Sequence, residues 1–295
     1  MAVTTANPTQ IGKTKRSSSL ALARRRFLSR KGAVIGLIFI IMEILMAIFA
    51  PLVAPYDPYY SDFTATYQAP SREHWFGTDD LGRDVLSRVI YGTRVSYAVG
   101  IFSQLAVVLI GLPIGAMAGL GGGKFDYAVM RIIDILSSIP GLLLYILLMV
   151  ALGAGLGNLI LAMALTGWIG ISRLVRGQVL SLKETDFVRA SRAMGGNTAW
   201  ITRKHIIRNS LTVVIVAVTL GIPGAMFAEA GLSFLGLGIP PPTPSWGQMI
   251  GIYAPYVRSF PWMMVYPAVV LAITMLAWIV MGDGVRDAID PNVRI

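Results

Sequence analysis

Long stretches without charged residues restrict the fold of this chain more than any other feature. The runs Val95–Gly123 and Ile135–Ser172 contain no Asp, Glu, Lys or Arg, and the second is 38 residues long. A helix rises about 1.5 Å per residue and the apolar core of a bilayer is about 30 Å thick. The second run is therefore long enough for two membrane spans, and the glycines of Gly153–Gly157 are the expected break between them.

The whole pattern of charge-free runs predicts six transmembrane helices. Charged residues make up only 14% of the 295 residues, against about 25% in soluble domains. This composition excludes a water-soluble enzyme and a disordered chain, so the predicted fold class is an all-α integral membrane protein. The six helices are expected at about 33–54, 95–120, 133–152, 158–177, 211–236 and 263–281.

Lys and Arg are divided unevenly between the two sides that six spans define. The side with both termini has 20 of these 25 residues and the other side has five. Because an excess of Lys and Arg marks cytoplasmic segments, both termini are predicted to be cytoplasmic. The net charge of +10 then reflects topology and attraction to anionic membrane lipid, and not nucleic-acid binding.

These assignments divide the chain into five regions, of which two contain long polar segments. No cleavable signal peptide is recognised, and residues 1–20 are expected to form a disordered tail. The regions are a cytoplasmic basic tail (1–32), a first transmembrane helix (33–54), an external loop (55–92), a transmembrane core (93–283) that includes a cytoplasmic loop (181–210), and a cytoplasmic C-terminal tail (284–295).

The external loop contains a dense polar motif between His74 and Asp84. Acidic residues, an arginine and two glycines close together are typical of a tight, hydrogen-bonded turn. Cation binding or catalysis by the carboxylates with His74 is an alternative, but the spacing fits no EF-hand loop and no nucleophile is evident. We expect structure or partner contact instead. The candidate contact residues are Trp75, Asp79, Arg83 and Asp84.

The cytoplasmic loop predicts a short amphipathic helix that ends at a glycine bend. Thr185 or Asp186 can cap its start, and Gly195–Gly196 end it. Its apolar face is small, because Ala190, Ser191 and Ala193 lie along it with Phe187 and Met194. A small face favours a fit into the groove of a partner protein over the alternative, adsorption to lipid headgroups.

Two acidic residues, Glu43 and Glu229, fall inside predicted spans. A carboxyl group at membrane depth is costly, so proton coupling or contact with a transported substrate are candidate roles. The structural alternative is a carboxyl that is hydrogen-bonded to a neighbouring helix.

The chain lacks the residues that thiolate or metal chemistry and ATP hydrolysis require. Cysteine is absent and there are only two histidines, which excludes thiolate catalysis and disfavours a metal site. The nearest approach to a phosphate-binding loop ends at Gly123–Lys124, but Ala118 replaces its first glycine and Phe125 replaces its hydroxyl residue. The chain is therefore predicted not to hydrolyse ATP by itself and to bind no cofactor.

Three segments carry a resemblance to a known family. They are HWFGTDDLGRDVLSRVIYGTRVSY (His74–Tyr97), GLSFLGLGIPPPTPSW (Gly231–Trp246) and MGDGVRDAIDPN (Met281–Asn292). With the six spans, over about residues 30–295, the chain resembles the C-type permease subunit of bacterial ABC importers for dipeptides and oligopeptides. This resemblance implies the type I ABC importer permease fold in the bacterial inner membrane.

The resemblance also implies partners and a coupling helix. A homologous permease chain would complete the pathway as a heterodimer, two cytoplasmic subunits would use ATP and Mg²⁺, and an extracytoplasmic binding protein would deliver the substrate. Relative to the family pattern, Arg189 replaces a glutamate, Ser191 an alanine and Arg208 a proline. The residues expected to contact the ATPase are Asp186, Phe187, Arg189, Ala190, Ser191, Ala193, Met194 and Gly195.

A proton-coupled secondary peptide transporter that uses Glu43 and Glu229 is the alternative function. It does not explain the long amphipathic cytoplasmic loop. Family members import dipeptides, longer peptides, glutathione, nickel chelates or oligosaccharides, and the sequence does not separate these substrates.

Overall fold

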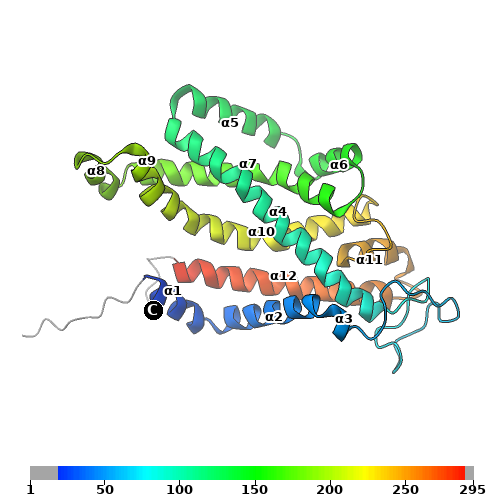
Figure 1. The fold of residues 1–295 in the computed structure, drawn as a ribbon. Coiled ribbons are helices and arrows are strands. Elements are labelled where there is room, and N and C mark those ends of the chain that lie inside the picture. The colour runs from blue at the N-terminus through cyan, green and yellow to red at the C-terminus, as the bar shows by residue number, and fades with distance from the viewer. Residues whose placement is uncertain (1–18, 290–295) are drawn as a thin grey trace, which may run out of the picture.

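The computed structural model describes residues 19–289, and the remainder of the two predicted tails lies outside this range. The described chain is helical (Figure 1). Its α-helices are α1 (Ser19–Ser29), α2 (Lys31–Ile48), α3 (Ala50–Val53), α4 (Val85–Gly121), α5 (Gly123–Ser137), α6 (Gly141–Leu152), α7 (Leu156–Lys183), α8 (Asp186–Ala193), α9 (Thr198–Ile201), α10 (Arg208–Phe234), α11 (Trp246–Tyr253) and α12 (Trp262–Ile289), with a π-helix at Thr202–Ile207 and a 3₁₀ turn at Ala254–Tyr256.

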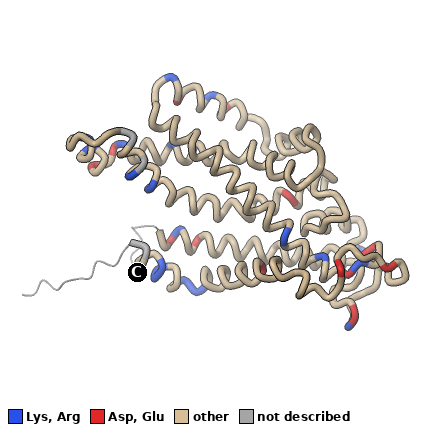
Figure 2. The backbone as a smooth tube through the Cα atoms, in the orientation of Figure 1, with Lys and Arg blue, Asp and Glu red and all other residues tan. Residues whose placement is uncertain are grey.

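The long helices form a bundle in which the successive crossings are α2, α4, the bent pair of α5 and α6, α7, α10 and α12 (Figure 1). Within residues 19–289, five helices are long and apolar enough to span a membrane, and a bent pair raises the number to six. Helix α1 and the end of α12 lie at the same end of the bundle (Figure 1). Lys and Arg gather at that end, near α8 and α9, while the middle of the bundle is mostly uncharged (Figure 2).

The third crossing differs from the single helix predicted at 133–152. It consists of α5 and α6, which meet at an angle of 86°. The break lies directly before Pro140, the N-cap residue of α6, because a proline ring disfavours helical geometry at the residue before it. Helix α5 also begins earlier than predicted, directly after Gly122. Its charged residues interrupt the apolar pattern, so the charge-free runs did not indicate a helix there.

The second crossing begins at Val85 and not near residue 95 as predicted. Asp84 caps the helix, since its side chain accepts a hydrogen bond from the backbone N–H of Ser87. The first turns of α4 contain Arg88 and Arg94. Because of these charged residues, this part of the helix was predicted as a polar loop. The external loop is therefore shorter than predicted, and its polar motif ends at the cap of α4.

Small residues allow α4 and α7 to pack closely over much of their length. A Cβ atom added to Gly111 would lie 2.9 Å from the carbonyl oxygen of Trp168, and one on Gly119 would lie 2.8 Å from Cβ of Val179. These distances are shorter than van der Waals contact, so larger side chains would push the helices apart. Small residues at such positions let two membrane helices approach each other closely.

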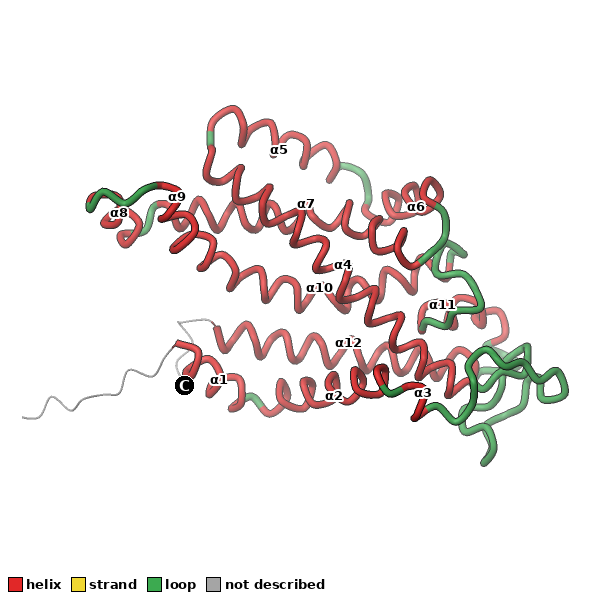
Figure 3. The backbone as a smooth tube through the Cα atoms, in the orientation of Figure 1, coloured by secondary structure: helices red, strands yellow, loops and turns green. Residues whose placement is uncertain are grey.

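The segment between α10 and α12 folds back against the bundle. Ser245 caps α11, and Trp246 and Met249 on this short helix are fully buried between α10, α12 and α4. The loops at this end of the bundle gather around α11 and the segment between α3 and α4 (Figure 3). The two predicted polar regions thus occupy opposite ends of the bundle.

Candidate functional site

Helix α8 presents an exposed apolar face at the end of the bundle where the Lys and Arg residues gather. Met194, which follows the helix, is 82% exposed and Phe187 is 45% exposed. Ala190 and Ala193 are exposed on the same helix. The opposite side of α8 holds it in place, because Val188 is fully buried in a cluster with Val179 and Ile201. We name the exposed residues Phe187, Ala190, Ala193 and Met194 the α8 surface.

The glycine bend after α8 has the geometry that the sequence predicted. Gly195 adopts a φ of +82°, a left-handed conformation that favours glycine. The backbone N–H of Gly196 donates a hydrogen bond to the carbonyl of Ser191 at 3.0 Å. Ser191 itself is buried, so its side chain does not belong to the exposed surface on which we expected it. Thr185 occupies the N-cap position, although its side chain forms no capping hydrogen bond.

The departures from the family pattern at residues 189 and 208 have local consequences in this chain. The guanidinium of Arg189 donates to Glu184 at 2.9 Å, an ion pair between two exposed side chains. Both Arg189 and Asp186 remain accessible. Arg208 begins α10 directly after the π-helix Thr202–Ile207, so the chain continues as a helix where the family has a proline.

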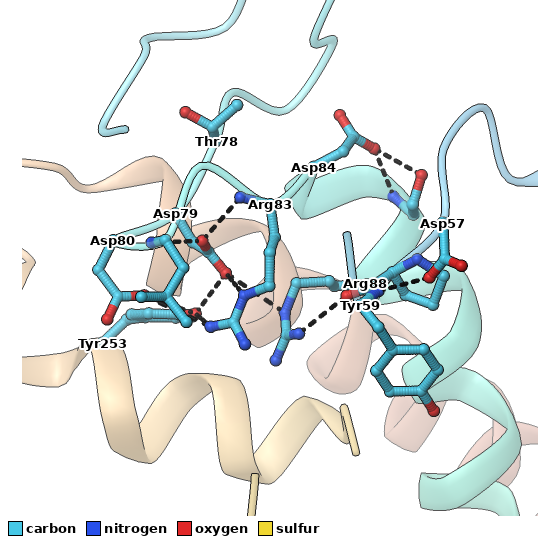
Figure 4. Close-up of polar contacts among 12 residues, drawn as sticks. Asp57, Tyr59, Thr78, Asp79, Asp80, Arg83, Asp84, Arg88 and Tyr253 are labelled. Atoms are coloured by element: carbon cyan, nitrogen blue, oxygen red, sulfur yellow. Dashed lines mark hydrogen bonds and ion pairs between the residues drawn. The ribbon is translucent and has the colours of Figure 1, made fainter. Parts of the chain in front are cut away.

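At the opposite end of the bundle, the external loop is organised around the buried carboxylate of Asp79 (Figure 4). Its Oδ2 accepts hydrogen bonds from Nε of Arg83 at 2.7 Å and from the hydroxyl of Tyr253 at 2.8 Å. Nε of Arg88 lies 3.5 Å from the same oxygen, and Nη1 of Arg88 donates to the carbonyl of Pro58 at 3.1 Å. One carboxylate thus joins the loop to α4 and α11.

The electrostatics of this cluster follow from its burial. Burial lowers the pKa of the Arg83 guanidinium, but Tyr253 and the Asp79 carboxylate outweigh this effect and leave the pKa above its ordinary value. Burial also raises the pKa of the Tyr253 phenol, and the charge of Asp79 raises it further. Tyr253 therefore stays neutral at physiological pH and keeps the proton that it donates to Asp79.

Asp84 forms a second anchor in the same loop. Its Oδ2 accepts hydrogen bonds from the backbone and the hydroxyl of Ser87, each at 2.7 Å, and its Oδ1 lies 3.0 Å from Nδ1 of His74. Within residues 19–289, no three acidic or histidine side chains are arranged to hold a metal ion. The described geometry thus gives no support to the cation-binding alternative.

The burial of this motif corrects part of the predicted contact set. Asp79, Arg83 and Asp84 are at most 7% exposed, so they hold the loop together and are not available to a partner. The predicted hydrogen-bonded turn is present. Trp75 is 69% exposed, and its contact with a partner stays a prediction.

Glu43 joins three helices inside the bundle. Its Oε2 accepts a hydrogen bond from the hydroxyl of Tyr97 on α4 at 2.6 Å, and its Oε1 accepts one from Thr274 on α12 at 2.7 Å. The side chain is 4% exposed. Both carboxylate oxygens are therefore satisfied by neighbouring helices, which favours the structural alternative for this residue.

Glu229 is fully buried and faces the beginning of α11. Its Oε1 accepts hydrogen bonds from Ser245 at 2.7 Å and from Ser233 at 3.0 Å. Ser245 is the N-cap of α11, where a negative charge is favourable. The carboxyl group thus connects α10 to the folded-back helix, and this position also favours a structural role.

Sequence reasoning missed the long-range partners of these carboxylates. Tyr253, Tyr97 and Thr274 carry no local pattern that links them to an acidic residue far away in the chain. Arg88, which contacts Asp79, likewise carries no local pattern that identifies its partner. Trp200, which is 48% exposed and lies under Nζ of Lys204 at 4.5 Å, adds an aromatic side chain next to α8.

Two families match different parts of this chain. Residues 111–295 match the family described as the binding-protein-dependent transport system inner membrane component. Residues 18–70 match the N-terminal transmembrane domain of oligopeptide transport permease C. The second match covers α1 and α2 together with the beginning of the external loop.

Similar proteins of comparable length support these matches. The chain is 46% identical to the oligopeptide transport system permease protein OppC of Bacillus subtilis (strain 168), over 92% of this chain and 89% of that protein. It is 44% identical to the dipeptide transport system permease protein DppC of the same strain, over 92% and 85%. A crystal structure of the MetNI methionine ABC transporter in an inward-facing conformation shares the fold, with 24% identity and a TM-score of 0.60 over 70% of this chain and 97% of that chain.

These matches decide between the two functions that the sequence left open. The matching family consists of ABC importer permeases, so the alternative of a proton-coupled secondary transporter is wrong. Such permeases are not enzymes themselves, as the missing phosphate-binding loop predicted. The chain belongs to the family of inner membrane components of binding-protein-dependent transport systems and has the type I ABC importer permease fold.

Proposed function

We propose that this chain forms, with a homologous permease chain, the pathway by which an ATP-driven importer moves di- or oligopeptides across the inner membrane. The peptide substrate is supported by the names of the similar proteins, which are oligopeptide and dipeptide permeases. An extracytoplasmic binding protein delivers the peptide to the end of the bundle that carries the external loop. Trp75 is the residue of that loop that we expect to contact it.

The opposite end of the bundle, with α1 and the end of α12, lies in the cytoplasm. The gathering of Lys and Arg at that end supports this orientation (Figure 2). It places α8 where two cytoplasmic ATP-binding subunits dock, one of them on this chain. Those subunits bind ATP and Mg²⁺, and this chain binds no cofactor.

The observation that carries this proposal is the α8 surface. Phe187 and Met194 are exposed, while Val188 fixes the helix to the body of the protein. An exposed apolar face on a firmly seated helix fits a groove in a partner protein. Closure of the ATP-binding subunits would move α8, and the continuous path from α9 through the π-helix into α10 would carry that motion into the membrane.

Purification of the tagged chain from its native membrane in mild detergent tests this assembly. We expect a second six-span chain and proteins with phosphate-binding loops to co-purify, together with a binding protein that selects peptides. Purification of the chain without any of these proteins, even after cross-linking, would contradict the proposal.

The absence of cysteine allows a sharper test of the docking surface. A single Met194→Cys substitution provides a unique thiol on the α8 surface, and we expect it to cross-link to the ATP-binding subunit. Leu109→Cys is the matched control, because Leu109 is 75% exposed on α4, in the middle of an apolar span. Equal cross-linking from both positions would contradict docking through α8.

A further inference from the structure

A groove of about 420 Å³ opens between α2 and α4, close to the end of α2 that leads into the external loop. Its walls are mainly apolar side chains from the two helices. They include Ile44 and Ile48 of α2 and Ala98, Ile101 and Phe102 of α4. Ile48 and Phe102 are each more than half exposed, so the groove opens outward from the chain and is not enclosed within it.

Arg94 is the charged residue of this groove. Its Nη2 atom lies 3.5 Å from the carbonyl oxygen of Ile48, the last residue of α2. Helix α2 has 18 residues, which correspond to about 27 Å of length and nearly cross an apolar layer of about 30 Å. Arg94 therefore lies at the boundary between the apolar layer and the headgroups, at the loop end of the bundle.

The charge of Arg94 has no acidic partner among residues 19–289. Its guanidinium lies 5.7 Å from the ring centre of Tyr91, and its side chain is exposed. An exposed guanidinium retains donors for a phosphate group, which it can bind through two parallel hydrogen bonds. The groove thus combines an anion-binding group at its mouth with apolar walls below.

The floor of the groove excludes a polar ligand such as a peptide. Tyr97 forms part of it, and the hydroxyl of Tyr97 is already engaged with Glu43 at 2.6 Å. A peptide in the groove would leave N–H and C=O groups without partners, at a cost of about 1–3 kcal/mol each. A hydrocarbon chain has no such groups and can fill the space between α2 and α4.

We propose that this groove is a binding site for an anionic phospholipid, with the phosphate on Arg94 and an acyl chain between Ile44, Ile48, Ile101 and Phe102. The bound lipid fills the seam between the first membrane helix and the rest of the bundle. It supplements the Glu43–Tyr97 hydrogen bond, which joins the same two helices. The site is independent of the α8 surface and of the substrate.

Lipid binding to the full chain in its purified complex tests this proposal. The complex is depleted of lipid, titrated with phosphatidylglycerol or with phosphatidylcholine of the same acyl chains, and analysed by native mass spectrometry. We expect tighter binding of phosphatidylglycerol and about fivefold weaker binding for Arg94→Gln, as for the loss of one basic residue at a membrane surface. Arg258→Gln is the control, since Arg258 is also exposed near the external loop.

Ala98→Leu tests the apolar half of the site separately. This change fills the groove from α4 and leaves Arg94 in place, so both lipids are expected to bind more weakly. Inorganic phosphate at millimolar concentration is expected not to displace the lipid. Unchanged binding in both Arg94→Gln and Ala98→Leu would overturn the proposal. So would cross-linking of an Ile48→Cys variant to the second permease chain, because the groove would then be a protein interface.

Discussion

The hydroxyl of Tyr253 donates a hydrogen bond of 2.8 Å to Oδ2 of Asp79, across 174 positions of sequence. Tyr253 is the last residue of α11, and Asp79 is the centre of the external loop (Figure 4). The bond joins two segments that precede different membrane helices. It is buried at both ends, so the loop behaves as part of the body of the protein.

Asp79→Asn is expected to destabilise the chain strongly. It removes the charge that faces Arg83 and Arg88, both of which are nearly inaccessible to solvent. An unpaired buried charge costs about 3–5 kcal/mol. The thermal unfolding midpoint of the detergent-purified protein measures the effect. Tyr253→Phe removes one hydrogen bond to the carboxylate and is expected to cost less, about 1.5–3 kcal/mol.

Asp80→Asn is the matched control for Asp79→Asn. Asp80 is the neighbouring acidic residue, but its side chain is partly exposed and its contact with Arg83 is 3.5 Å long. We expect little change in the unfolding midpoint. Similar losses from both substitutions would mean that the net charge of the loop matters and that the geometry around Asp79 does not.

Glu43→Ala is expected to loosen α2 from the bundle. The substitution leaves the hydroxyl of Tyr97 without its buried acceptor, at a cost of about 1–3 kcal/mol. Thr274 also loses its bond to Glu43 but can still donate to the carbonyl of Val270 at 2.8 Å. Glu43→Gln keeps an acceptor oxygen and is expected to cost less. Protease sensitivity of the segment before α2 and the unfolding midpoint measure both effects. A Glu43→Gln complex that is stable and hydrolyses ATP but transports nothing would contradict the structural role.

Much of the fold could be predicted because a membrane helix is recognisable from its own stretch of sequence. An apolar run and its flanking charges are sufficient to place α7, α10 and α12. Helix α5 escaped prediction since Asp126 and Asp134 interrupt its apolar pattern. Both are paired with arginines of α7, Asp126 with Arg176 and Asp134 with Arg173. An ion pair between helices reduces the cost of charge, but only the structure shows that the partners meet.

The α8 surface is expected to provide docking energy without contributing to the fold. We predict that Phe187→Ala and Met194→Ala weaken binding of the ATP-binding subunit by about tenfold each, as for apolar anchors of an interface that contribute 1–2 kcal/mol. The unfolding midpoint of the isolated chain is expected to stay unchanged, since both side chains are exposed. Binding of the purified subunit to the chain in nanodiscs measures the affinity.

Val188→Ala separates docking from folding on the same helix. Val188 is fully buried, so its truncation is expected to lower stability, by about 1–2 kcal/mol for a small cavity. A Val188→Ala chain with normal stability, or a Met194→Ala chain that unfolds early, would reverse our assignment of the two faces.

Glu229→Gln is expected to leave transport of a labelled oligopeptide close to that of the native complex. The glutamine oxygen can still accept the hydrogen bond from Ser245. Glu229→Ala removes the acceptor and is expected to destabilise the contact between α10 and α11 by about 1.5–3 kcal/mol. Transport, ATP hydrolysis and the unfolding midpoint are measured together. Loss of transport in Glu229→Gln with normal assembly and hydrolysis would indicate a pathway role instead.

Features of the site that depend on residues adjacent in the chain could be predicted from the sequence. Features that depend on contacts between distant segments could not. The helix and glycine bend of residues 186–196 follow from residues adjacent in the chain, and the structure has both. Ser191 shows the limit of this reasoning, because its small side chain suited the apolar face but lies on the packed side. The burial of Asp79 and Arg83 was equally hidden, since it depends on α11, which is distant in sequence.

Replacing Gly195 and Gly196 together with alanine is expected to uncouple ATP hydrolysis from transport. An alanine in the left-handed conformation of Gly195, with φ of +82°, costs about 1–2 kcal/mol. A Cβ atom on Gly196 would lie 2.7 Å from the carbonyl oxygen of Ser191. The bend must therefore open, and α8 would extend and carry Met194 out of position.

Transport and ATP hydrolysis by the reconstituted complex measure this uncoupling. We expect hydrolysis to continue while transport of a labelled oligopeptide falls by at least about tenfold, the effect of roughly 1.4 kcal/mol on a coupling equilibrium. Gly177→Ala in α7 is the control, because an added Cβ atom there meets nothing within 4 Å. Full transport by the double variant would show that the bend does not position the α8 surface, and α8 would lose its role in coupling.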